Sequence, residues 1–128
     1  MHANEAMVRD GYAAMSKGDG SKLAALLGPK SQWILPGTSP IAGTYTGPPV
    51  IFEHWKRIAV ETGGGTKMDV IDVLANDDRA AALIRMHGSR GERTYDGHQV
   101  AIFEIADGLI SSATFVHHDA AAWDAFWS

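Results

Sequence analysis

The sequence has 128 residues and a formal net charge of −4, from 11 lysines and arginines against 15 aspartates and glutamates. Its length predicts one domain over residues 1–128, and its 45% hydrophobic and 20% charged residues exclude a disordered or fibrous chain. A mildly acidic chain without cysteine is a poor candidate for binding nucleic acid or anionic membranes, and it can hold no disulfide, catalytic thiol or thiolate zinc site.

The first 28 residues predict two helices. The first runs between a cap at Asn4 and a stop at Gly18, with an apolar face at helical spacing formed by Val8, Tyr12 and Met15. Asp19 or Ser21 caps the second helix, which ends at Gly28-Pro29. Charged residues interrupt the apolar ones from the start of the chain. We therefore expect neither a signal peptide nor a membrane span, and the cytoplasm is the expected location.

A short strand and a third helix are expected next. The strand covers Gln32–Leu35 and leads into the loop Pro36–Pro40. The helix opens at Gly47-Pro48-Pro49, because proline suits the first turn of a helix, and Gly63-Gly64-Gly65 ends it. Its apolar face consists of Ile51, Trp55 and Ile58, with His54 beside them.

The second half of the sequence predicts a sheet. Four runs rich in β-branched and aromatic residues are separated by short turn signals: Met68–Ala75, Ala80–Ser89, Arg93–Ile105 and Leu109–His118. Gaps this short permit only antiparallel hairpins. A last helix begins at Asp119, a favourable N-cap, and buries Trp123, Phe126 and Trp127. This order defines an α+β fold, in which a strongly bent, mostly antiparallel sheet around three helices forms a cone with an internal pocket.

The turns decide which residues share a face of this sheet. If Ala106-Asp107-Gly108 and Ser89-Arg90-Gly91 are three-residue loops, odd-numbered residues stay together across three strands. The odd face then forms the pocket wall, with Leu83, Arg85, His87, Tyr95, Gln99, Ala101, Phe103, Ala113, Phe115 and His117. The even face is an apolar outer surface suited to homodimer formation, with Ile84, Val100, Ile102 and Val116. A two-residue turn at Asp107-Gly108 would instead bring His98 opposite His117.

Polar side chains on the odd face are the candidate catalytic residues. His117 is the candidate for proton transfer, because histidine titrates near neutral pH. Arg85 would stabilise an enolate or bind a carboxylate, while Tyr95 and Gln99 would position a substrate carbonyl. Asp119 would orient His117. The alternatives are a half-exposed histidine without a role, an arginine in a structural ion pair, and an aspartate that only caps the last helix.

Helices and strands are both expected to line the pocket. The candidate substrate-binding residues are Tyr12, Trp33, His54, Trp55, His87, Phe103 and Phe115. For His54 and the aromatic residues, the alternative is ordinary core packing. No metal site is expected, because His117 and His118 point to opposite faces of one strand and no helix carries a pair of ligands on adjacent turns.

Several segments of the sequence are similar to one known family. They are the stretch from Trp33 to Gly47 (WILPGTSPIAGTYTG), Gly63-Gly64-Gly65-Thr66, the turn Ala106-Asp107-Gly108 and the ending Asp119–Trp127. From about Val8 onward the chain resembles the SnoaL-like branch of the nuclear-transport-factor-2-like superfamily, related to ketosteroid isomerases. The resemblance implies a cone-shaped, cystatin-like fold with a curved antiparallel sheet around three helices. This superfamily contains isomerases, polyketide cyclases, epoxide hydrolases, dehydratases and noncatalytic binding modules, so the fold alone does not determine the function.

The catalytic residues of two relatives are not matched. At the positions of the aspartate base, the tyrosine and the oxyanion aspartate of ketosteroid isomerases, this chain has Leu35, Gly11 (next to Tyr12) and Ala101. Of the charged groups of limonene-epoxide hydrolases, Arg85-Met86-His87 matches only the arginine.

The resemblance and the pocket residues together imply a cofactor-free enzyme of the isomerase, cyclase or lyase type. It would move a proton on an apolar, carbonyl-bearing small molecule, such as a polyketide. The first alternative is a noncatalytic ligand-binding or dimerisation module. The second is an epoxide hydrolase, which would require Asp96 or Asp119 to point inward beside Arg85.

Overall fold

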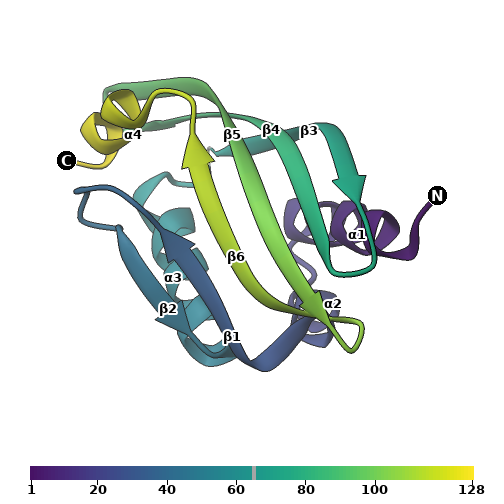
Figure 1. Ribbon diagram of the computed structural model, residues 1–128. Helices are drawn as coiled ribbons and strands as arrows, with labels where there is room; N and C mark the ends of the chain where they lie inside the picture. The colour runs from purple at the N-terminus through teal and green to yellow at the C-terminus, as the bar shows by residue number, and fades with distance from the viewer. Residues whose placement is uncertain (65) are drawn as a thin grey trace.

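The computed structural model describes residues 1–64 and 66–128. In chain order (Figure 1) the helices and strands are α1 (Ala3–Lys17), α2 (Gly20–Leu26), β1 (Leu27–Leu35), β2 (Gly43–Thr46), α3 (Pro48–Glu61), β3 (Lys67–Ala75), β4 (Arg79–Arg90), β5 (Arg93–Ala106), β6 (Leu109–His117) and α4 (Ala120–Trp127). The three helices, the four long strands of the second half and the final helix are those predicted from the sequence.

The helix ends follow the predicted cap chemistry with one exception. Gly18 ends α1 in the left-handed conformation at φ 67°, and the side chains of Asp19 and Asp119 accept hydrogen bonds from the first turns of α2 and α4. The cap of α1 is His2 rather than Asn4. The Asn4 amide instead donates to the carbonyls of Asn76 and Asp77, which ties α1 to the β3–β4 turn.

The predicted first strand, Gln32–Leu35, was too short, because β1 begins at Leu27. Gly28-Pro29 does not end a helix but lies inside β1, whose pairing with β6 is irregular between Leu27 and Gln32. That irregularity accommodates proline, which cannot donate a ladder hydrogen bond. The strand β2 was not predicted separately and pairs with the end of β1. The helix α3 opens at Pro48 as predicted; its predicted stop includes Gly65, which lies outside the described residues.

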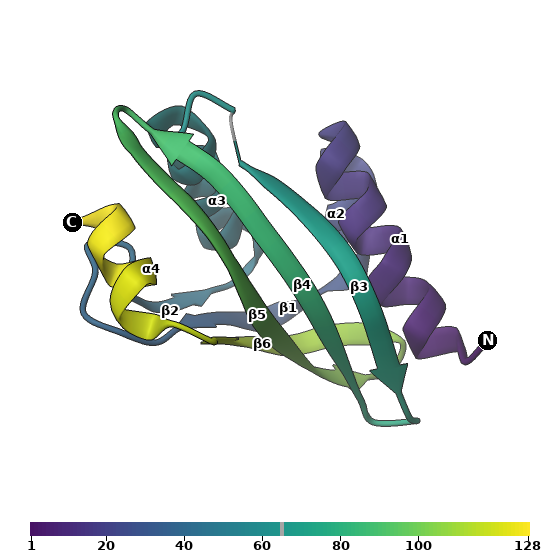
Figure 2. The ribbon, with the colours of Figure 1, turned by 90° about the horizontal axis from the view of Figure 1, so that it is seen from above.

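One curved sheet carries all six described strands in the order β2-β1-β6-β5-β4-β3. All neighbours are antiparallel except β1 and β6, which are parallel. The helices α1, α2 and α3 lie on one side of the sheet, and α4 lies at the end where β6 finishes (Figure 2). Helix α1 packs on β3 and β4 while α3 packs on β1 and β2, so the sheet wraps around the helical layer.

The turn between β4 and β5 differs from the prediction. Arg90 pairs with Arg93, so the loop has only two residues, Gly91 and Glu92, and Gly91 has φ 62°. Odd residues of β4 therefore face the same side as even residues of β5. The even residues Ala80, Ala82, Ile84 and Met86 form the buried side of β4. Ile84, predicted on the outer surface, is completely buried.

The turn between β5 and β6 is the alternative form considered above. Asp107 and Gly108 both have positive φ, at 55° and 73°, as a two-residue type I′ turn requires. An irregularity between Glu104 and Ile105 then shifts the pairing by one residue, and Gln99 lies opposite His117. His98 therefore stays on the outer face, and the odd residues of β5 and β6 face inward as predicted.

The interior between the sheet and the helices is packed with aromatic side chains. The helix α4 contributes Trp123, Phe126 and Trp127, all buried as predicted. Trp33, Tyr95, Phe103 and Phe115 enter the same core from the sheet. None of the described helices combines the length and apolar character needed to cross a membrane.

Candidate functional site

Three of the predicted catalytic side chains meet on the inner wall of the cone. Gln99 on β5 lies opposite His117 on β6, and only 5% of Gln99 is exposed. Tyr95 lies on the same face of β5 and is also buried. Its ring lies over Gly97, where a Cβ would approach the ring carbon Cζ to 2.7 Å. The phenol hydroxyl is therefore directed along β5 toward Gln99.

His117 is a half-buried, neutral imidazole. Its ring stacks on Trp123, with centroids 4.1 Å apart and an interplanar angle of 17°. Its Nε2 is buried and has no hydrogen-bond partner among the described residues. Burial lowers the pKa of His117 to about 4, and the nearby Asp124 carboxylate partly opposes this effect. At neutral pH the ring is therefore a free base with an available acceptor nitrogen.

Tyr95 is a neutral hydrogen-bond donor whose ring contacts the same Trp123 as this base. Burial raises the pKa of its phenol, and the negative charges of Asp119 and Asp96 add to the effect. Its hydroxyl is buried and without a partner among the described residues, while its ring contacts Trp123 edge-on at 5.3 Å. A buried hydroxyl in this state can satisfy its hydrogen bond with a ligand.

A small aromatic cavity lies at the other end of the interior. It has a volume of about 30 Å³, and its lining residues are Val8, Gly11, Tyr12, Met15, Leu23, Leu26, Leu27, Trp33, Trp55, Phe103 and Ile110. Trp33 and Trp55 meet edge-on at 5.1 Å, as do Tyr12 and Phe103 at 6.2 Å. The Tyr12 hydroxyl is buried without a partner among the described residues, and burial raises its pKa.

Trp33 and Phe115 connect the aromatic cavity with His117. Trp33 lies 6.2 Å from Phe103 in the cavity wall and 5.0 Å from Phe115, measured between ring centroids. Phe115 lies on β6 two residues before His117 and opposite Ala101. Phe103 lies four positions after Gln99 on β5, a distance of about 13 Å along the strand. The packed rings of Trp33 and Phe115 thus lie between the aromatic cavity and the His117 side chain.

His54 lies in the helical layer and is buried, with 5% exposure. Its ring stacks on Tyr45 at 4.1 Å, and the Tyr45 hydroxyl donates to the Ile41 carbonyl at 2.6 Å. Burial, and secondarily the charge of Arg57, lowers the pKa of His54 to about 4. The structure therefore places His54 in a packed stack between α3 and β2, whereas Tyr12 lines the aromatic cavity.

The predicted inward orientation of Arg85 and His87 was wrong. The two-residue turn at Gly91-Glu92 places both side chains on the outer face of β4. Arg85 donates two hydrogen bonds to Asp96, at 2.9 and 2.6 Å, and its side chain is 44% exposed. This contact holds the pKa of Asp96 below its ordinary value. His87 contacts Asp69 at 3.1 Å on the same outer face.

The arrangement required for epoxide hydrolysis is also not formed. Asp96 lies outside with Arg85, and the Asp119 carboxylate accepts the Ala122 N–H as the cap of α4. The helix-capping alternative for Asp119 is thus the observed one. Inward-facing carboxylates beside Arg85 are not found in the described part of the chain.

Asp124 was not predicted and lies near His117. It is the acidic residue of an otherwise apolar helix, Ala-Ala-Ala-Trp-Asp-Ala-Phe-Trp, and this exception in the α4 sequence was the available signal. Its Oδ2 accepts hydrogen bonds from the backbone N–H and the hydroxyl of Thr38, both at 3.3 Å. Its Oδ1 is buried without a partner among the described residues.

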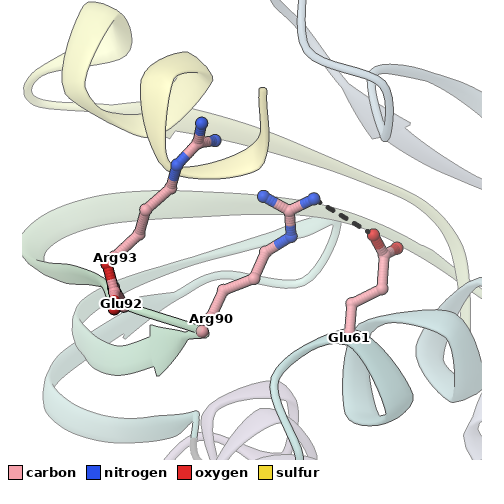
Figure 3. Close-up of a pocket in the computed structure, with 5 residues that line it drawn as sticks. Glu61, Arg90, Glu92 and Arg93 are labelled. Carbon is pink, nitrogen blue, oxygen red and sulfur yellow. Dashed lines mark ion pairs between the residues drawn. The ribbon is translucent and has the colours of Figure 1, made fainter.

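A surface pocket of about 590 Å³ lies where the β4–β5 turn meets α3 and α4 (Figure 3). Arg90 points toward Glu61, with nitrogen and oxygen 3.6 Å apart, and donates to the carbonyls of Phe126 and Ser128. Arg93 donates to the carbonyls of Ala125 and Ser128. Both arginines therefore already have partners. Their hydrogen bonds hold the end of α4 against the β4–β5 turn.

Comparison with known proteins agrees with the fold. The family model described as the SnoaL-like domain matches residues 8–113. An uncharacterized protein of Mycobacterium tuberculosis, Rv0034, is 27% identical over 123 residues, which cover 95% of this chain and 94% of that protein. The structure of Bal32a, from a soil-derived mobile gene cassette, is 35% identical with a TM-score of 0.95, covering 98% of this chain and 97% of Bal32a.

A second solved structure has the fold type that the sequence resemblance implied. A protein from Xanthomonas campestris with a cystatin-like fold is 23% identical with a TM-score of 0.91, covering 100% of this chain and 99% of that protein. The predicted α+β, cystatin-like cone and the SnoaL-like resemblance are therefore confirmed.

Proposed function

We propose that this chain, which belongs to the SnoaL-like domain family, is a cofactor-free enzyme that moves a proton on an apolar, carbonyl-bearing small molecule. The observation that carries this proposal is the pair formed by His117 and Gln99. A neutral imidazole with a free acceptor nitrogen lies opposite a buried primary amide on the inner wall. A base and a hydrogen-bond donor in adjacent positions are the minimum set for forming and stabilising an enolate.

The reaction would begin at the carbon beside the substrate carbonyl. Nε2 of His117 takes a proton from this carbon, and the electron pair moves onto the carbonyl oxygen. The Gln99 amide and the Tyr95 hydroxyl donate hydrogen bonds to that oxygen. The imidazolium returns the proton to another carbon in an isomerisation, or to a departing hydroxyl in a dehydration. In a cyclisation the enolate carbon attacks a second carbonyl carbon, and the new alkoxide takes the proton.

The aromatic cavity would bind the apolar end of the same molecule. Its walls are aliphatic and aromatic, and the Tyr12 hydroxyl offers a single hydrogen bond to an acceptor on the ligand. At about 30 Å³ the cavity has room for no more than a few water-sized atoms. Binding therefore requires Trp33, Trp55 or Phe103 to change rotamer and enlarge it.

A noncatalytic ligand-binding role is the second candidate. It is favoured by the apolar lining of the cavity and by the edge-on packing of Trp33 on Trp55 inside it. In this case Tyr12 fixes the orientation of the ligand, and His117 has no chemical role.

One experiment separates the two candidates. Cyclic ketones and cyclic 1,3-diketones of increasing length are titrated while tryptophan fluorescence reports binding. The same compounds are incubated in deuterated buffer, and NMR follows exchange beside the carbonyl. Binding with catalysed exchange supports the enzyme, and binding without exchange supports the binding module. If ligands of about 13 Å length neither bind nor exchange, both proposals are wrong.

The outer sheet face would hold a second copy of the chain. Leu83, Val100 and Val116 are consecutive cross-strand neighbours on this face, and Ile102 extends the row. Half of the Val116 surface is exposed, and Leu83 and Ile102 are also exposed. A contiguous apolar patch of this kind favours an isologous homodimer.

A further inference from the structure

The loop after β1 brings Asp124 close to the end of β6. In the parallel β1–β6 pair Ile34 lies beside Thr114, and three residues further along each segment the chain reaches Gly37 and His117. Gly37 contacts Asp124 so closely that a Cβ at this position would lie 2.5 Å from Oδ1. Trp123, the residue before Asp124, stacks on the His117 ring. Three contacts thus place this carboxylate beside the imidazole.

The local backbone is adapted to the carboxylate. Gly37 has φ +114°, a conformation that side chains rarely adopt, and it leaves the space that Oδ1 occupies. The next residue, Thr38, donates two hydrogen bonds to Oδ2 and fixes the rotamer of Asp124. Oδ1 of Asp124 and Nε2 of His117 are both buried and unpartnered among the described residues.

We propose that Asp124 is a positioning residue for His117: its fixed carboxylate stabilises the imidazolium that forms when His117 takes a proton. The role in turnover rests on the proposed function, whereas the electrostatic coupling of the two side chains does not. Asp124 replaces Asp119 in this role, since the Asp119 carboxylate is used as the cap of α4. No direct ion pair joins Asp124 and His117 within the described residues, so the coupling acts across a short gap.

Among the described side chains that face His117, Asp124 is the one that carries a charge. From β5 the ring faces the uncharged Gln99 and the neutral phenol of Tyr95. From α4 it faces Trp123 and Asp124, and the loop after β1 contributes Gly37 and Thr38, which do not titrate in this range. Removing the charge of Asp124 should therefore make the imidazolium less stable.

The test is an NMR titration of the histidine ring of His117, from pH 8 down to the onset of acid unfolding, in the absence of any substrate. We expect Asp124→Asn, which keeps the shape and can still accept from Thr38, to lower the pKa of His117. The fraction of charged ring at a given pH should fall roughly threefold or more. Asp124→Glu, which keeps the charge, should restore most of the difference. The matched control is Asp107→Asn, which removes a charge from the exposed β5–β6 turn at the far end of β6 and should leave the His117 titration unchanged.

Two results would overturn the proposal. One is an unchanged His117 titration in folded Asp124→Asn, and the other is an equal change in Asp124→Asn and Asp124→Glu, which indicates a packing role. If Asp124→Asn does not fold, Gly37→Ala tests the same contact by displacing the carboxylate, and an unchanged titration there is also contradictory. With a turned-over substrate, Asp124→Asn should lower kcat about tenfold with little change in KM. Because the titration needs no substrate, failure of the proposed function is distinguishable from failure of this pair.

Discussion

Gln99 and His117 face each other across the β5–β6 pair, on the buried wall of the cone. The two side chains would not share this wall without the irregularity between Glu104 and Ile105, because the tight turn at Asp107-Gly108 alone would turn one strand over relative to the other. One extra residue in β6 therefore assembles the candidate site, and the predictions below test its parts.

Replacing His117 tests the proposed base. His117→Gln keeps a polar side chain of similar size but cannot accept a proton from carbon. We expect turnover of any substrate that is found to fall about 100-fold or more, with little change in melting temperature. His118→Gln is the matched control, because His118 is exposed and its backbone N–H pairs with the His98 carbonyl. Full activity in His117→Gln would remove His117 from the mechanism.

Stability should fall as the solution becomes more acidic than pH 6.5. His54 and His117 have folded pKa values of about 4, below the ordinary value of 6.5. Between these limits the unfolded chain binds more protons than the folded one, so stability is complete above pH 6.5 and is lost as the pH falls to 4. After allowance for solvent screening, the loss is on the order of 2 kcal/mol per histidine.

Urea denaturation at pH 7.5 and pH 5 measures this dependence. Replacing either His54 or His117 with glutamine should reduce the difference between the two pH values by about half. Replacing the exposed His98 should leave the difference unchanged. An equal free energy of unfolding at both pH values would contradict the burial of neutral imidazoles.

Tyr12 should be dispensable for folding but not for ligand binding. Its hydroxyl has no partner among the described residues, so Tyr12→Phe removes an unsatisfied polar group and should leave stability unchanged or slightly increased. A ligand that accepts a hydrogen bond from this hydroxyl should bind about tenfold more weakly. Fluorescence titration checks the affinity and urea denaturation checks the stability. Unchanged affinity for every ligand would place the ligand's acceptor elsewhere.

A charge on the outer face should disrupt the proposed dimer. Val116→Lys places a lysine in the apolar row of the outer face, directly opposite Val100. We expect sedimentation velocity to show a dimer for the native chain and a monomer for this variant. Leu74→Lys on β3, which is also exposed but lies outside the row, serves as control. A native chain that sediments as a monomer at all concentrations would exclude the dimer.

Arg85 should have no part in catalysis. Its guanidinium is paired with Asp96 on the outer face, where water screens the pair. We expect Arg85→Ala to change turnover less than twofold and to change the melting temperature only slightly. A large loss of turnover in an Arg85→Ala variant that remains a dimer would show that the outer face affects the reaction at His117. Gln99→Ala, on the inner face, is the comparison that should reduce turnover.

The location in the cytoplasm and the apolar, carbonyl-bearing class of the substrate stay predictions. The aromatic cavity and the His117 pair support the proposed ligand class, an apolar body with a carbonyl group. They do so through side chains that the sequence already indicated, such as Trp33, Trp55 and Tyr12.

The sequence by itself determined most of the elements and the fold class, because helix caps, turn residues and the alternation of apolar residues are local signals. Gly18, Asp19 and Asp119 mark helix ends with little help from the rest of the chain. Alternation within β5 also predicted its inward face, with Tyr95 and Gln99.

Only the tertiary structure decided which strand faces share the interior. A difference of one residue in a turn reverses the facing of the next strand. The two-residue loop at Gly91-Glu92 therefore placed Arg85 outside and Ile84 inside. The position of Asp124 beside Gly37 joins residues 87 positions apart, and no local pattern encodes such a contact. Contacts of this kind depend on how the sheet curves around its helices, which is fixed by packing of the whole core.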